Sequence, residues 1–241
     1  MSNIQNLVNL AAAEVGYLEK KSNANLDDKT ANAGSNNYTK YARDYCLWGF
    51  GNYQAQPWCD IFVSWCFKMA FNDDSVASHD SYCPYHVNWF KAQNRWAHDG
   101  PNIGDVIFFK DSSGVAHHTG IVINVDKSKV YTIEGNTSSA AGVVVNGGCV
   151  AQKSYALTYS SILGFGHPNY NIIKEQEMRY NTLSEIPEWG QFSVQKRIDA
   201  GAIADTQNLN LSEDMIRTWV IDDRYYKSIG LLGDNLDLKI P

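Results

Sequence analysis

One segment, residues 59–71, constrains the fold more than any other part of the chain. As a helix it has apolar side chains on nearly every face, and it contains neither glycine nor proline. A helix without a polar face has to be buried on all sides. The sequence therefore predicts a central helix enclosed by other elements. Hydrophobic residues make up 44% of the 241, which is enough to enclose it and excludes a disordered chain.

Elements of two kinds flank this helix. Apolar residues between Ile4 and Leu18 recur three and four positions apart, which predicts an amphipathic helix. Residues 20–37 are rich in Asn, Asp, Ser, Gly and Lys and predict a long surface loop. After Gly104, β-branched and aromatic runs predict an antiparallel sheet, with strands at residues 106–109, 119–125, 130–133 and 143–145. The expected class is α+β, with N-terminal helices packed on an antiparallel sheet.

The strand signals stop near residue 170, where a polar connector begins. We therefore expect two domains, residues 1–171 and a small helical domain at 172–241. In the second, Pro187 suits a first helical position and Gly201 a helix end, and Ser212 suits an N-cap.

Charge and cysteine content exclude several classes of protein. The net charge is −6 and no Lys/Arg cluster is present, so a nucleic-acid partner is not expected. No apolar run approaches the ~20 residues of a membrane span, and the first 19 residues contain Glu14 but no Lys or Arg. We expect neither a membrane anchor nor a secretory signal. Five cysteines without a C-x-x-C pair argue against a disulfide framework or a structural zinc site.

Cys59 opens the central helix directly after Pro57 and Trp58. The free backbone N–H groups and the positive dipole end at a helix start favour a thiolate, and they can also stabilise an oxyanion on an attacked carbonyl. Cys59 is therefore a candidate nucleophile. The alternative is a small core residue, because free cysteines are among the most buried residue types. Cys66, seven residues further into the helix, is expected to be such a core residue.

A cysteine nucleophile needs a base, and His118 has the best setting of the six histidines. If residues 126–128 form a three-residue hairpin loop, His118 faces Asn136 and lies diagonal to Glu134 on one sheet face. Either residue can then accept the ring N–H while the other ring nitrogen faces the thiol. Taken singly, Glu134 can be a surface carboxylate and Asn136 a turn former. The opposite face would be apolar, formed by Ile121, Ile123, Val125, Tyr131 and Ile133.

The other histidines are expected outside this site. His117 should point away from His118, because adjacent strand residues face opposite sides of a sheet. Four more lie in turn-rich or loop contexts, and nothing pairs them with a cysteine: His79, His86, His98 and His167.

Four blocks follow one another in order: Trp58–Cys66, Gly104–Phe109, His118–Val122 and Ile133–Thr137. They resemble the successive motifs of CHAP domains, the cysteine, histidine-dependent amidohydrolases/peptidases. The resemblance covers about residues 3 to 170. It implies a papain-like fold with Cys59 as nucleophile, His118 as base, and Glu134 and Asn136 as polar partners. Family members cleave peptidoglycan amide bonds, and many are phage endolysins or bacterial autolysins.

Some members of that family bind calcium through an Asp-rich loop before the nucleophile. Residues 49–56 contain no Asp-x-Asp pattern, so no calcium, other metal or cofactor is expected. The C-terminal part resembles one S-layer-homology-like helical unit of the kind appended to Gram-positive wall hydrolases. A wall-binding module and a structural or self-association element both stay open, because aromatic platforms for sugars are limited to Trp189 and Trp219.

The resemblance implies a peptidoglycan hydrolase that acts by cysteine acyl transfer on a Gram-positive wall. Without a visible signal sequence, we expect a phage endolysin made in the host cytoplasm and released through a holin lesion. The bond can be the muramoyl–L-alanine amide or one within the peptide. The alternatives are an NlpC-type endopeptidase, a bacterial autolysin and a non-catalytic wall-binding protein. The Glu-x-Asn ending of the strand after His118 favours CHAP.

Overall fold

Helix α3 (Cys59–Phe71) is the buried centre of the first part of the computed structural model, which describes residues 3–172 and 179–230. Every residue from Cys59 to Phe67 is buried, as the apolar pattern predicts. Each large apolar side chain taken out of water contributes about 1.5–3 kcal/mol. The burial of α3 therefore fixes the position of its first residue, Cys59.

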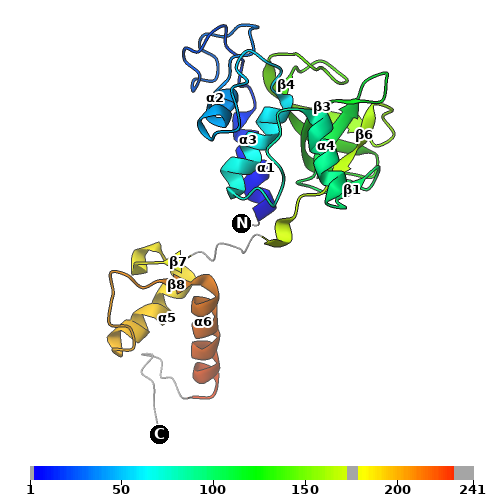
Figure 1. Ribbon diagram of the computed structural model, residues 1–241. Helices are drawn as coiled ribbons and strands as arrows, with labels where there is room; N and C mark the ends of the chain where they lie inside the picture. The colour runs from blue at the N-terminus through cyan, green and yellow to red at the C-terminus, as the bar shows by residue number, and fades with distance from the viewer. Residues whose placement is uncertain (1–2, 173–178, 231–241) are drawn as a thin grey trace. The chain divides into compact units, whose positions relative to one another are not determined.

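Three further helices surround α3 and the sheet: α1 (Asn3–Glu14), α2 (Lys40–Leu47) and α4 (Cys83–Ala92). Helices α1 and α2 pack on α3, and α4 packs against the sheet (Figure 1). The apolar pattern predicts α1 but neither α2 nor α4. Each of these two is short and begins at a local signal: the Thr39 hydroxyl caps α2 by accepting from the Ala42 N–H, and Pro84 occupies the first turn of α4.

A six-stranded antiparallel sheet forms the rest of this part. Its order is β1-β6-β2-β3-β4-β5, with β1 (Trp96–Ala97), β2 (Val106–Lys110), β3 (Ala116–Val125), β4 (Lys129–Thr137), β5 (Cys149–Ala156) and β6 (Ile162–Gly166). The strands expected at 106–109, 119–125 and 130–133 are confirmed. The strand expected at 143–145 is wrong, because these residues lie in the loop before β5, just after Gly142, whose φ is 76°. Along most of strand β5, buried and exposed residues alternate, and the strand lacks a long apolar run.

The predicted register of β3 and β4 is confirmed next to the site, where Ile121 pairs with Ile133 and Val122 with Thr132. A bulge then inserts Ile123, so that Asn124 pairs with Tyr131. The extra residue exchanges the two faces for the rest of the strand. Val125 therefore packs on the sheet face opposite to Ile121, in the cluster that includes Val122 and Val130. The prediction that Val125 and Tyr131 extend the apolar face of Ile121 is wrong beyond the bulge.

The sheet buries both faces. One packs on the helices, with Val106, Phe108, Ile121 and Ile133 in the same cluster as the residues of α3. The other carries a smaller cluster: Ile107, Phe109, Val122, Val130, Tyr155 and Phe165. The result is a mixed α+β structure, as expected.

The chain divides into two compact units, Met1–Ile173 and Lys174–Pro241, near the boundary after residue 171 that the sequence suggests. The second unit contains β7 (Arg179–Tyr180), β8 (Leu211–Ser212), α5 (Glu188–Asp199) and α6 (Glu213–Ser228). Two of the three helix signals are confirmed here: Ser212 caps α6 by accepting from the Met215 N–H, and Gly201 comes after α5 with a φ of 71°. The placement of Pro187 is wrong by one residue, because with a ψ of 144° it is the N-cap of α5 and Glu188 is the first helical residue. Among the described residues, no helix is long and apolar enough to span a membrane.

Candidate active site

Cys59 is the first residue of α3, and its thiol is buried. The preceding residue, Trp58, does not cap the helix with its side chain, so its side chain leaves the backbone N–H groups at this end to other acceptors, one of which is the Cys59 sulfur. The Trp58 indole Nε1 donates to Glu19 Oε2 at 2.9 Å, and both residues are buried. Glu19 thereby fixes the residue that precedes the candidate nucleophile.

His118 lies on β3 with its side chain fully buried, and its Nε2 is 2.9 Å from Glu134 Oε2 on β4. The same carboxylate accepts from the Thr132 hydroxyl at 2.6 Å and from the Tyr155 hydroxyl at 3.1 Å. Because three donors converge on Glu134, the His118 proton on Nε2 is fixed, and Nδ1 is left to face the nucleophile. Nδ1 has no nitrogen or oxygen partner among the described residues, which leaves it to interact with the Cys59 thiol.

Two glycines make the approach of these elements possible. A Cβ at Gly120 would lie 2.5 Å from Glu134 Cγ, so only glycine leaves room for that side chain beside β3. A Cβ at Gly135 would lie 2.5 Å from Phe62 Cβ, so only glycine lets β4 come this close to α3. The glycines that come after His118 and Glu134 in the sequence therefore assemble the site sterically.

The thiol and the imidazole shift each other's titration. Hydrogen bonds from Cys83 and then from His118 lower the pKa of the Cys59 thiol well below its ordinary value, although burial acts in the opposite direction. Burial lowers the pKa of His118, but the hydrogen bonds with Cys59 and Glu134 outweigh it and raise that pKa to about 9. A thiolate–imidazolium pair is therefore the expected state near neutral pH.

Asn136 is also buried, two residues beyond Glu134 on β4, with a φ of 53°. Its side-chain amide has no hydrogen-bond partner among the described residues. Of the two residues expected to accept the His118 N–H, Glu134 therefore does so and Asn136 does not. The Asn136 amide keeps both its donor and its acceptor capacity.

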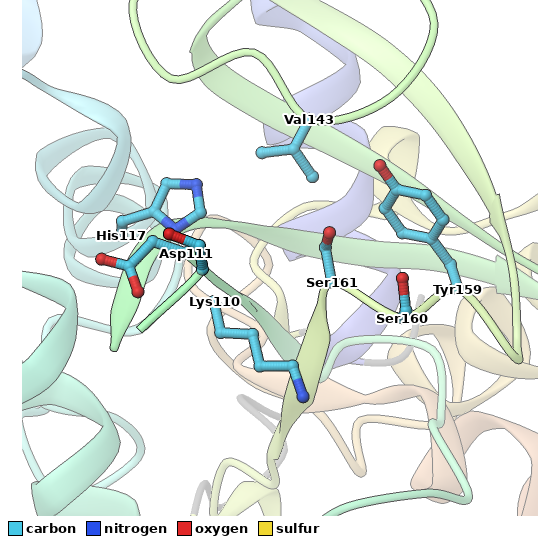
Figure 2. Close-up of a pocket in the computed structure, with 8 residues that line it drawn as sticks. Lys110, Asp111, His117, Val143, Tyr159, Ser160 and Ser161 are labelled. Atoms are coloured by element: carbon cyan, nitrogen blue, oxygen red, sulfur yellow. The ribbon is translucent and has the colours of Figure 1, made fainter. Parts of the chain in front are cut away.

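His117 makes no hydrogen bond within this group. It lies at the irregularity where β2 and β3 shift register, and it lines a separate pocket of about 470 Å³ together with Lys110, Asp111, Tyr159 and Ser161 (Figure 2). Neither Cys59 nor His118 lines that pocket. The side chain of His117 is half-buried, and its Nδ1 has no hydrogen-bond partner among the described residues. It lines this separate pocket, which the buried pair does not reach.

Two features of the site are not predicted from the sequence. Cys83 is the first residue of α4, and its sulfur lies 3.9 Å from that of Cys59. The assignment of His86 to a loop is wrong, because it lies on α4, and its Nδ1 is 2.7 Å from Asp60 Oδ1 in a fully buried pair. The Cys83–Pro84 dipeptide is a helix-start signal that could have located a second cysteine at a helix end.

No metal site is evident in this part of the structure. Residues 3–172 and 179–230 contain no group of three or more His, Cys, Asp and Glu side chains that could hold an ion. All five cysteines are free thiols. The functional groups that the site brings together are a buried thiol, an imidazole and a carboxylate.

Solved structures and one family model are similar to parts of this chain. Among solved structures, the chain is similar to the crystal structure of Ly7917 (15% identity, TM-score 0.42, 70% of this chain and 63% of that one). It is also similar to the crystal structure of Ly7917 with the hydrolyzing product of MDP (15% identity, TM-score 0.40, 68% and 62%). The chain thus spans less than two thirds of the length of these structures. No curated protein matches it. Residues 37–136, which hold Cys59, His118, Glu134 and Asn136, match the family model of the CHAP domain.

Proposed function

We propose that this chain hydrolyses an amide bond of bacterial peptidoglycan by acyl transfer, with Cys59 as nucleophile, His118 as base and Glu134 as the residue that orients the imidazole. The observation that carries the proposal is the buried His118 Nε2–Glu134 Oε2 hydrogen bond, which leaves Nδ1 for the thiol. The CHAP match over residues 37–136 supplies the substrate class.

In the proposed reaction the Cys59 thiolate attacks the amide carbonyl carbon, and the tetrahedral oxyanion meets the free N–H groups at the start of α3. Collapse breaks the C–N bond, and His118 Nδ1–H protonates the departing amine. The neutral imidazole then takes a proton from water, whose oxygen attacks the thioester. The acid leaves, and the thiolate and imidazolium are restored. Glu134 accepts the hydrogen bond from Nε2 and stabilises the imidazolium in both steps.

Two kinds of peptidoglycan amide bond are candidates for the bond that is cleaved. An N-acetylmuramoyl-L-alanine amidase and an endopeptidase that cuts within the peptide use the same thioester chemistry, and an NlpC-type endopeptidase would as well. The resemblance to CHAP endolysins extends the proposal to Gram-positive walls and to a phage origin, with a bacterial autolysin as the alternative.

Mass spectrometry of fragments released from purified Gram-positive walls tests this proposal. An amidase exposes a free L-alanine amino group and leaves an intact glycan, whereas an endopeptidase exposes new termini within the peptide. His118→Ala, which loses the base, should release neither set, and His117→Ala serves as its matched control. Reducing ends from glycosidic cleavage, or no fragments from any wall tested, would reject the proposed reaction.

We further propose that the second unit binds the wall. Its support is an exposed aromatic surface: Trp189 is 40% and Phe192 47% exposed, and the Arg217 guanidinium lies 5.0 Å from the centre of the Trp189 ring. Exposed aromatic rings present flat faces to sugars and peptides. Self-association through the helices is the alternative.

Cosedimentation of the full chain with purified walls separates these cases. Trp189→Ala should reduce binding to walls and leave the hydrolysis of soluble wall fragments unchanged, because tethering raises only the local concentration at an insoluble substrate. Ile221→Ala is the matched control, since Ile221 on α6 is also exposed. Unchanged sedimentation of Trp189→Ala together with a concentration-dependent molecular mass would favour self-association.

A further inference from the structure

Two helices of the first unit begin with a cysteine, and these cysteines meet at the site. Cys59 is the first residue of α3 and Cys83 of α4, and their Sγ atoms lie 3.9 Å apart. Both are buried free thiols, 5% and 4% exposed. Neither helix has a side-chain cap, so the positive ends of two helices are directed at one pair of sulfurs. One negative charge is favoured there, and two would repel.

The neighbouring groups decide which sulfur carries that charge. Cys59 faces His118 from β3, and it also accepts from the Asp60 backbone N–H. Cys83 faces Cys59 and the Asp60 carboxyl, which is paired with His86 of α4. The imidazole therefore favours a thiolate at Cys59. Beside that thiolate and the carboxyl, the pKa of Cys83 is raised, first by its hydrogen bond to Cys59 and then by burial, so Cys83 keeps its proton.

We propose that Cys83 donates its S–H proton in a hydrogen bond to the Cys59 thiolate and, together with His118, holds the nucleophilic sulfur ready for attack. This inference rests on the proposed function, because it adds a residue to the same site. The proton stays on Cys83 throughout. When Cys59 is acylated, its sulfur becomes neutral and the hydrogen bond weakens, so Cys83 acts on the resting thiolate rather than on the thioester. A role of this kind appears most clearly in the pH dependence of thiolate formation.

The test measures the rate at which iodoacetamide alkylates Cys59 between pH 4 and pH 10, read by mass spectrometry of the Cys59 peptide in the full chain. A weak S–H donor to a charged acceptor corresponds to a shift of about one pH unit. Cys83→Ala should therefore raise the midpoint of the alkylation profile by about one unit and slow the reaction up to about 10-fold below the midpoint. The plateau at high pH should not fall, because a more basic thiolate is at least as nucleophilic.

Two variants separate this role from a packing effect. Cys83→Ser retains a hydroxyl donor and should keep the midpoint close to that of the wild type. Cys66→Ala is the control, because it removes a buried thiol from the same helix as Cys59. The hydrogen bond between sulfurs at the site joins Cys59 to Cys83 and does not involve Cys66. The alkylation profile of Cys66→Ala should therefore match that of the wild type. A lower plateau without a shifted midpoint in Cys83→Ala would indicate packing alone and overturn the proposal.

A rise of about one pH unit in the alkylation midpoint of Cys83→Ser would also overturn the proposal, because this variant retains a hydrogen-bond donor. This variant keeps the test valid where Cys83→Ala fails to fold, as judged by circular dichroism. Alkylation requires no wall substrate. A shifted midpoint in a chain that releases no wall fragments would therefore retain the role of Cys83 on the thiolate and reject only the hydrolase function.

Discussion

Replacing Glu134 with glutamine removes one charge from the site and keeps its shape. The carboxylate accepts from His118, Thr132 and Tyr155. A glutamine can turn its NH₂ group towards the Thr132 hydroxyl, whose oxygen also accepts, and leave its carbonyl oxygen to the other two donors. Glu134→Gln is therefore expected to fold and to test the electrostatic role of this residue.

The expected magnitude is set by the titration of His118. Its pKa is raised from 6.5 to about 9, which corresponds to about 3 kcal/mol in favour of the imidazolium. Burial opposes this shift, so the combined effect of Cys59 and Glu134 is larger still. Since the two partners share it, loss of the Glu134 charge should lower the His118 pKa by about 1–2 units. Loss of the orienting charge should slow hydrolysis by about 10- to 10⁴-fold.

Nuclear magnetic resonance of ¹⁵N-histidine-labelled protein measures this pKa directly, with the His118 signals assigned from their absence in His118→Ala. Tyr155→Phe is the matched control, because it removes one donor from the carboxylate and keeps the charge. Its His118 pKa should stay within about half a unit of the wild type. An unchanged His118 pKa in folded Glu134→Gln would refute the stabilisation of the imidazolium by Glu134.

Three further predictions concern neighbouring residues. Cys66→Ala should cost about 1–3 kcal/mol in unfolding free energy and leave wall hydrolysis intact, because Cys66 is buried in α3, and thermal melts with turbidity assays check both. His117→Ala should hydrolyse walls within a few-fold of the wild-type rate, and a loss as large as that of His118→Ala would contradict its place outside the site. Burial raises the pKa of Asp60 from 3.8 to about 6, so its contribution is fully present below pH 3.8 and is lost as the pH rises through 6. Urea unfolding should show that Asp60 contributes a loss of up to about 3 kcal/mol in unfolding free energy as the pH rises from 3.8 to 6 in the wild type. Asp60→Asn should lack this loss.

Local patterns predict much of the fold because their physical causes are local. The apolar run of α3, the Ser212 cap and the strands on either side of residues 126–128 each arise from periodicity or turn chemistry. The bulge at Ile123 does not, because nothing in the local pattern marks the extra residue. Strand β5 escapes prediction for a related reason: it is stabilised by pairing with β4 and by the burial of alternate residues, not by an apolar run.

The part of the candidate site that lies on one hairpin could be predicted from the sequence, and the part formed by the packing of two helices could not. The hairpin places His118 beside Glu134, and the sequence distance between them is short enough for register arithmetic. Cys83 comes to Cys59 through the packing of α3 and α4, which no spacing encodes. The choice between Glu134 and Asn136 as the histidine partner likewise depends on the positive φ of Asn136, a backbone detail set by the tertiary structure.

The most direct test of the central claim is the release of fragments from purified walls by Cys59→Ala, compared with the wild type at equal protein concentration. Removing a nucleophile should reduce the rate by several orders of magnitude while the thermal melt stays close to that of the wild type. Acyl transfer through Cys59 predicts no fragments above the enzyme-free background from this folded variant. Fragment release by Cys59→Ala at a rate within about 10-fold of the wild type would contradict acyl transfer through this cysteine.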